Sequence, residues 1–71
     1  MNMDLKMKLK YDVYKGTADD MKNCGGELIG RKVSAAGLAR FADNSADKVE
    51  RLHDGELVHT SKGTIWIEEA A

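Results

Sequence analysis

Two histidines and two acids lie close together in the sequence and are the first candidates for catalytic or metal chemistry. His53 and His59 are six residues apart, and Asp54 and Glu56 stand between them. A hydrolytic or metal centre built on these side chains needs a third ligand and a pocket. A chain of 71 residues leaves little volume for such a pocket. We therefore predict solvated histidines, one at a helix end and one on a strand, in a protein that is not an enzyme and holds no metal or cofactor.

Cys24 and the glycines that follow it are the second candidate. Because the chain has one cysteine, it forms no internal disulfide, which suits a reducing compartment. Only Lys22 stands nearby to lower the thiol pKa, so we expect an inert, partly buried cysteine. The segment GGELIG, residues 25–30, lacks the lysine and Ser/Thr of a P-loop and does not fit GxGxxG, which argues against nucleotide binding.

Charge and hydropathy narrow the function classes further. The chain has 11 basic and 12 acidic residues, a formal net charge of −1, and 42% hydrophobic residues. This balance gives no overall electrostatic preference for nucleic acid. The apolar runs are too short to span a membrane, and the N-terminus lacks the apolar segment of a signal peptide. We expect one small cytoplasmic domain over residues 1–71 that does not enter a membrane.

The N-terminal segment has a regular pattern. Apolar and charged residues alternate from Met3 to Tyr14, which predicts a strand with one buried face. The outward lysines are typical of a protected edge strand, and we prefer this interpretation to a basic binding patch. Thr17 then caps a short helix over Ala18–Cys24. Glycines at 25 and 26 end it, and an extended segment with Gly30 at a bulge follows over Glu27–Val33.

Residues 34–53 read as two short helices separated by a tight turn. Ser34 is the expected cap of a helix over residues 35–42, in which Gly37 indicates close packing or a weak helix. Asp43 and Asn44 supply the turn, and Ser45 caps a second helix that ends near residue 53. In that second helix Val49 and Leu52 share one face.

The C-terminal part predicts a β-hairpin over residues 56–68. Its strands, 56–60 and 64–68, are rich in β-branched and aromatic residues, and Ser61-Lys62-Gly63 forms the turn. Alternation places Ile65 and Ile67 on one face and Trp66 on the other. Trp66 is therefore either a large core residue or an exposed interaction anchor. The predicted fold class is α+β: an N-terminal strand, a short helix, a helix-turn-helix and a hairpin.

The segment from Ser34 to Glu68 resembles a winged helix-turn-helix. Residues 38–45, LARFADNS, are similar to the motif LA-x-x-x-G-x-S, with Asp43 where glycine is usual. Ala39 matches the small residue at the helix crossing, Ser45 the cap of the second helix, and Val49 its buried valine. Leu52 comes one residue earlier than the usual apolar position.

The resemblance implies a function for the second helix and the hairpin. In that family the second helix enters the DNA major groove and the wing contacts the backbone. The face of the second helix would be Ala46, Asp47, Lys48, Glu50, Arg51 and His53, and the wing would offer His59, Thr60 and Lys62. The side chains that we predict to bind a partner or nucleic acid are Arg40, Lys48, Arg51, His53, His59 and Lys62.

Charge on the second helix decides between two functions. Asp47 and Glu50 would oppose DNA phosphates, whose neutralisation drives most protein–DNA affinity. We therefore expect a small regulator that binds a protein of the transcription machinery. In its size and composition, the chain resembles phage-encoded inhibitors of bacterial RNA polymerase. The alternative is a DNA-binding repressor or excisionase-like protein that acts as a dimer. A third hypothesis is an accessory protein whose first strand pairs with a partner.

Overall fold

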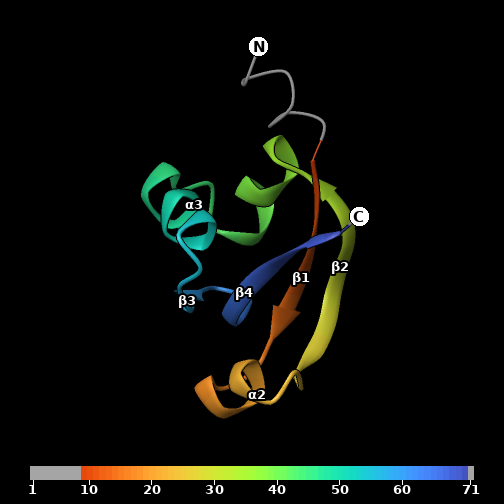
Figure 1. Ribbon diagram of the computed structural model, residues 1–71. Coiled ribbons are helices and arrows are strands. Elements are labelled where there is room, and N and C mark those ends of the chain that lie inside the picture. The colour runs from red at the N-terminus through yellow and green to blue at the C-terminus, as the bar shows by residue number, and fades with distance from the viewer. Residues whose placement is uncertain (1–8, 71) are drawn as a thin grey trace.

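A computed structural model describes residues 9–70 of the chain, and one antiparallel sheet of four strands dominates it (Figure 1). The strand order across the sheet is β2-β1-β4-β3. The elements in chain order are β1 (Lys10–Lys15), α2 (Ala18–Lys22), β2 (Glu27–Ser34), the 3₁₀ helix η1 (Ala36–Phe41), α3 (Ala46–His53), β3 (Val58–Thr60) and β4 (Gly63–Ala70). The predicted α+β class is confirmed.

The first strand lies in the middle of the sheet, so its prediction as an edge strand is wrong. β1 pairs with β2 on one side and with β4 on the other. Tyr11 and Val13 point into the core, as the alternating pattern predicts. The expected strand began at Met3, and its part before Leu9 lies outside the described residues. The true edges are β2 and the short β3.

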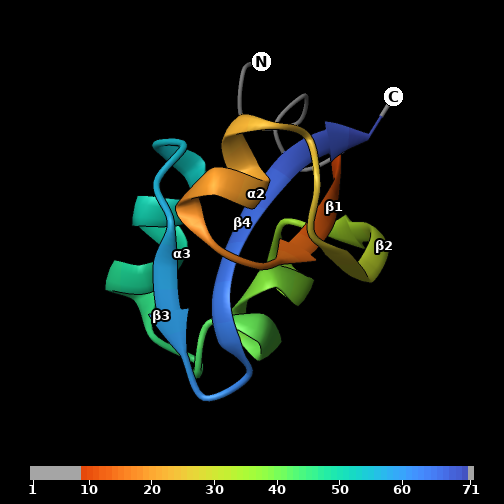
Figure 2. The same cartoon turned by 90° about the horizontal axis from the view of Figure 1, so that it is seen from below.

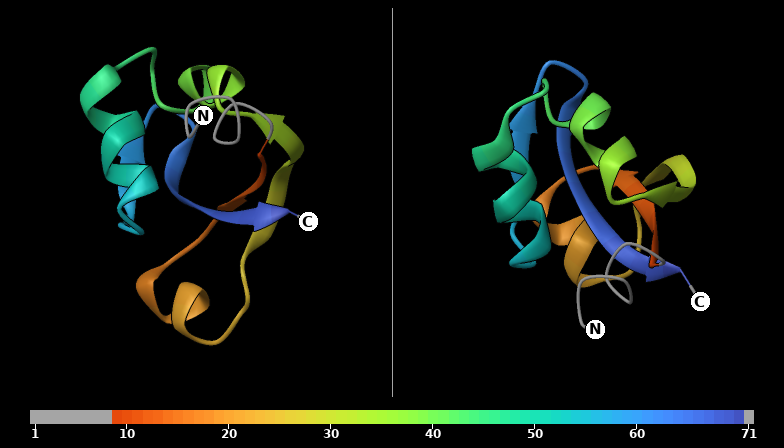
Figure 3. Two further views of the ribbon diagram at one scale, coloured as in Figure 1. Left: turned by 45° about the horizontal axis from the view of Figure 1, so that its top comes forward. Right: turned by 90° about the horizontal axis from the view of Figure 1, so that it is seen from above.

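The helices lie on opposite sides of the sheet. Seen from below, α2 is in front of β4, whereas η1 and α3 are behind the sheet (Figure 2). The views in Figure 3 show η1 and α3 on the other face. Between these helices and the strands lies the buried core, which consists of Tyr11, Val13, Leu38, Ala42, Leu52, Val58 and Ile65.

Trp66 is buried on the α2 side of the sheet, which settles its two alternatives in favour of packing. Its side chain is 2% exposed. The indole stacks on the ring of Tyr14 in the neighbouring strand, with ring centroids 5.8 Å apart. Gly26 approaches the indole closely. Its φ is +90°, and a Cβ on this glycine would lie 2.5 Å from Cη2 of the Trp66 ring. The loop after α2 therefore closes over the tryptophan.

The short helix α2 begins as predicted and ends earlier. Thr17 Oγ1 accepts a hydrogen bond from the Asp20 N–H, and the Asp20 carboxylate accepts one from the Thr17 N–H, at 3.1 and 2.9 Å. This reciprocal pair is a capping box. The helix stops at Lys22, and Cys24 adopts a left-handed φ of 58°. Cys24 is exposed, so its prediction as partly buried is wrong.

The extended segment predicted over Glu27–Val33 is confirmed as β2, which runs to Ser34 and is irregular. Its register against β1 shifts on both sides of Val13, which pairs with Gly30. Lys32 has a φ of 49°, and its N–H donates to Asp12 Oδ1 at 3.1 Å. These bulges twist an outer strand and so reduce the length of regular edge that it presents.

The first helix of the predicted pair is a 3₁₀ helix, not an α-helix. Its backbone closes with short-range bonds, such as that from the Ala42 N–H to the Ala39 carbonyl at 3.1 Å. Ser34 was expected to be the N-cap, but this position is taken by Ala35, one residue later. The Ser34 hydroxyl still accepts a hydrogen bond from the Gly37 N–H at 3.1 Å. Gly37 packs closely on β2, since a Cβ there would lie 3.0 Å from Val33 Cγ1.

The turn, the second helix and the hairpin follow the sequence closely. Asp43 and Asn44 have left-handed φ values of 56° and 55°. Ser45 accepts from the Lys48 N–H at 3.3 Å and so caps α3. In the hairpin Thr60 pairs with Gly63, whose φ is 116°. The strand predicted from residue 56 begins at Val58.

Candidate functional site

A groove runs between η1 and α3 and is the larger of two neighbouring hollows on this face. We call it the helix groove. Its volume is about 680 Å³. Small apolar side chains form its walls: Ala35, Ala36, Ala39, Ala46 and Val49. Asn44, Glu50, His53 and Asp54 complete the lining. Because alanine side chains are short, the helix backbones lie close to any molecule that enters the groove.

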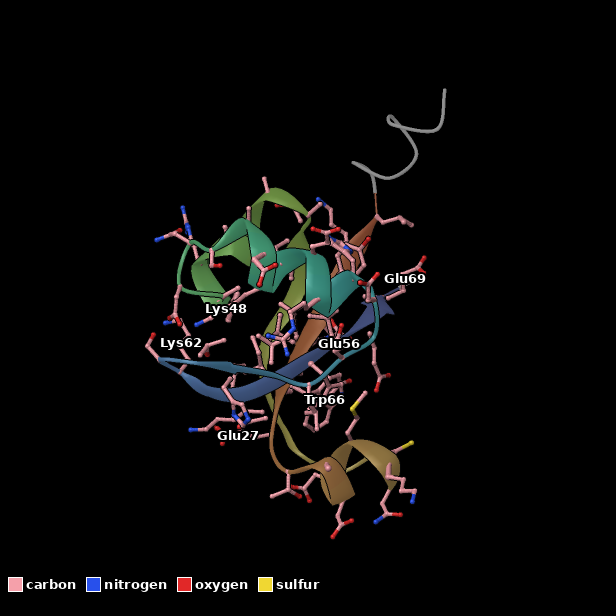
Figure 4. All side chains as sticks on the ribbon, turned by 90° about the vertical axis from the view of Figure 1, so that its left-hand side faces the viewer. Glu27, Lys48, Glu56, Lys62, Trp66 and Glu69 are labelled. Carbon is pink, nitrogen blue, oxygen red and sulfur yellow. The ribbon has the colours of Figure 1, made fainter. Side chains whose placement is uncertain are left out.

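A second hollow of about 390 Å³, the end pocket, lies beside the C-terminal end of α3. Tyr11, Leu52, Gly55 and Ile67 line it together with Glu69 of β4. His53 and Asp54 line both hollows, so the end pocket adjoins the helix groove. Figure 4 shows Glu69 at this end of the molecule.

Both hollows are acidic. The charged side chains that line them are Glu50, Asp54 and Glu69, and none of their lining residues is Lys or Arg. All three acids are exposed. Burial raises the pKa of the Tyr11 hydroxyl, and the negative charge of Glu69 raises it further. The end pocket is thus a site of negative potential with an apolar wall.

The two histidines do not form a common site. His53 is half-buried and its ring meets the Tyr11 ring edge to face, with centroids 5.2 Å apart and an interplanar angle of 77°. It is therefore less solvated than predicted. His59 is exposed on β3, as expected, and its Nδ1 lies 2.8 Å from the Thr64 hydroxyl. Within residues 9–70 no group of three or more His, Cys, Asp or Glu side chains could hold a metal ion.

Asp43 links the turn between the helices to the turn of the hairpin. Its carboxylate accepts from the Ser61 N–H at 3.1 Å and also from the Ser61 hydroxyl. It forms an ion pair with Lys48, with Nζ and Oδ2 2.8 Å apart. The hydrogen bond from Lys48 and those from Ser61 lower the pKa of Asp43 to about 2. Asp43, which stands where the motif usually has glycine, therefore connects the turn between the helices to the hairpin turn.

The remaining predicted binding residues are dispersed. Arg51 is paired with Glu56, with Nε and Oε1 3.3 Å apart. Arg40 on η1 and Lys62 in the hairpin turn are exposed. Lys48 and Lys62 lie at one end of α3, and Glu69 lies at the other (Figure 4). The six side chains thus do not form one basic surface, and two of them are neutralised by acids.

The charge on Asp43 should make the fold sensitive to acid. Because its pKa is lowered from 3.8 to about 2, its stabilising contribution is complete above pH 3.8 and is lost as the pH falls toward 2. Asp43→Asn keeps a residue that tolerates left-handed backbone but removes the charge. We expect the variant to be less stable at pH 7 and the difference to shrink below pH 3.8. Urea unfolding at several pH values measures it; a difference independent of pH would contradict this assignment.

Comparisons with known proteins identify no family for this chain. No protein-family model, no curated protein and no solved structure matches the chain. Within the part of the chain that the structure describes, no helix is long and apolar enough to cross a membrane.

The groove was not predicted from the sequence, although part of its signal was present. Ala39 matches the small residue at the helix crossing of the motif, and Ala35, Ala36 and Ala46 stand in the same segment. Small residues on the facing sides of two helices leave a hollow where larger side chains would fill it. Glu69 carried no such signal, because only the pairing of β4 with β1 brings it beside Tyr11.

Proposed function

We propose that this chain is a small non-enzymatic regulator that acts by binding a protein in the bacterial cytoplasm. The observation that carries the proposal is the helix groove, an apolar hollow with an acidic rim on the exposed side of η1 and α3. Grooves between helices commonly receive a helix or an extended segment of a partner. The 71-residue chain has 32% charged residues, which keep the remaining surface polar.

The arrangement of charges favours protein over DNA as the ligand. Lys48 and Arg51, which would have to contact phosphates, are held by Asp43 and Glu56. Breaking these pairs would lower the gain from phosphate contact. Glu50 is on the same helix, lies at the rim of the helix groove and would repel the DNA backbone. Binding of a protein partner requires neither the breaking of these ion pairs nor the approach of a phosphate to Glu50.

The partner that we propose is a component of the transcription machinery, with RNA polymerase as the first one to test. The support is the similarity of residues 38–45 to a winged helix-turn-helix and the order of η1, turn, α3 and hairpin. Asp43 and Asn44 form the tight turn and Ser45 caps α3, as in that motif. On this proposal the helix pair serves as a protein-binding surface.

Ala46→Arg tests the proposal because it fills the helix groove from an exposed position. Ala18→Arg is a matched control: Ala46 follows the cap Ser45 of α3, Ala18 follows the cap Thr17 of α2, and both are exposed. Pull-downs from bacterial lysate are made with nuclease. We expect wild type and Ala18→Arg to retain RNA polymerase subunits, and Ala46→Arg to lose at least nine-tenths of them, a change of about 1.4 kcal/mol.

The same experiment separates the alternatives. A protein partner that Ala46→Arg retains fully would place the binding surface outside the helix groove. Enrichment of DNA that disappears on nuclease treatment, without a protein partner, would favour the alternative of a dimeric winged helix-turn-helix repressor or excisionase-like protein. The observation on the side of that alternative is the well-formed turn and cap before α3.

A further inference from the structure

The helix groove and the end pocket together define the chemistry of the segment that they would bind. The groove supplies a smooth apolar wall of Ala35, Ala39 and Val49. Such a wall accepts the apolar stripe of a short amphipathic helix, since alanine allows two helices to approach closely. A flat polar surface or an extended charged strand would leave this wall uncovered.

The acidic side chains around this wall determine which charge the contacting side chains of a partner should carry. Glu50 and Asp54 line the groove, and Glu69 lines the end pocket. Lys48 is paired with Asp43, so it does not offset these acids. Complementary charge on the partner must therefore be positive, because like charges across an interface are strongly unfavourable.

The end pocket adds a place for one long basic side chain. Tyr11 and Ile67 provide an apolar wall, while the carboxylates of Asp54 and Glu69 lie on its lining. A lysine or arginine side chain has an aliphatic stem that packs on apolar surface and a charged head that stays near the solvent. The pocket offers both surfaces to it. The raised pKa of the Tyr11 hydroxyl, to which Glu69 contributes, is consistent with this negative potential.

We propose that the helix groove and the end pocket bind a basic amphipathic helix of a partner protein, whose small apolar side chains face the groove and whose lysine or arginine enters the end pocket. The inference rests on the proposed function and specifies its ligand. Its occupant is a helix of another protein; a second copy of this chain is an outcome that the test identifies.

Glu69→Lys tests the charge of the end pocket, and Glu68→Lys is its matched control. The two glutamates are neighbours on β4, both are exposed, and only Glu69 lines the pocket. The probe is a fluorescein-labelled helical peptide of about 16 lysine, alanine and leucine residues. We expect Glu69→Lys to weaken its binding about tenfold and Glu68→Lys less than twofold, by fluorescence anisotropy. Circular dichroism confirms that both variants are folded.

Several outcomes would overturn the inference. Equal weakening by both variants would show diffuse attraction between opposite charges, and equal binding of a glutamate version of the peptide would exclude a basic ligand. Failure of the wild-type protein to bind the lysine peptide would also refute it. Self-association measured by sedimentation, if Glu69→Lys abolishes it, would replace the partner by a second copy. Capture of a protein that Ala46→Arg loses would leave the proposed function intact in each case.

Discussion

Trp66→Ala is expected to destabilise the fold by about 4 kcal/mol, because it removes the largest side chain that is buried in the sheet. The loss includes the stacking on Tyr14 and the contact with the loop at Gly26. At about 0.1 kcal/mol per residue, a chain of 71 residues would have a total stability of about 7 kcal/mol. The variant should therefore stay folded but unfold at a much lower urea concentration. Circular dichroism is the measurement, since the fluorescent residue is lost.

Trp66→Phe is the informative control for this prediction. Among the residues that the structure describes, the buried Nε1–H of Trp66 has no hydrogen-bond acceptor. An unpaired buried donor costs roughly 1–3 kcal/mol, and phenylalanine removes it while keeping an aromatic ring beside Tyr14. We therefore expect Trp66→Phe to cost less than half as much as the alanine variant. Equal losses would contradict the packing described for this face of the sheet.

The local features of the fold were predictable because their causes are local. Thr17 and Ser45 cap helices with hydroxyls that reach N–H groups three residues ahead. The hairpin turn before Gly63 likewise needs only the few residues that form it. The type of the first helix was less accessible, because 3₁₀ and α helices have similar residue preferences and differ by one position in their hydrogen bonds.

Strand order could not be inferred from the sequence. Lys6, Lys8 and Lys10 suggested an edge; Lys10, which is the one of the three within the described residues, is exposed at the start of a strand that lies in the middle of the sheet. The decisive information is the pairing of β1 with β4, which joins residues at least fifty positions apart. Alternation within one strand reports which face is buried and carries no information on which strands are its neighbours.

The ion pairs of the predicted binding residues could not be inferred from the sequence for a similar reason. The cations lie on α3 itself, and their acidic partners lie just outside it. Lys48 pairs with Asp43 before α3, and Arg51 pairs with Glu56 after it. Each partner is five positions away, so the i to i+4 spacing of ion pairs within a helix does not reveal it. Once these pairs form, acids rather than cations dominate the surface beside α3.

Leu52→Ala is expected to destabilise the fold by about 3 kcal/mol, because this side chain anchors α3 to the sheet. Leu52 is 1% exposed and belongs to the main core. About 4 kcal/mol of the total stability would remain, so the variant should stay almost completely folded. Any weaker binding of a partner would then come from the altered wall of the end pocket, which Leu52 also lines. Urea unfolding and peptide anisotropy on the same sample measure both effects. A stability loss below 1 kcal/mol would contradict the assignment of Leu52 to the core.

Val49→Ala separates folding from binding on the same helix. Val49 lies three residues before Leu52, is half-buried, and lines the helix groove. Its truncation should cost about 1 kcal/mol of stability, much less than that of Leu52, because part of its surface already meets solvent. Its effect on partner binding should instead exceed what this small loss of stability explains, since the folded population stays near complete. α3 would then hold its fold with Leu52 and present Val49 to a partner. A Val49→Ala variant that binds like wild type would move the contact away from this wall.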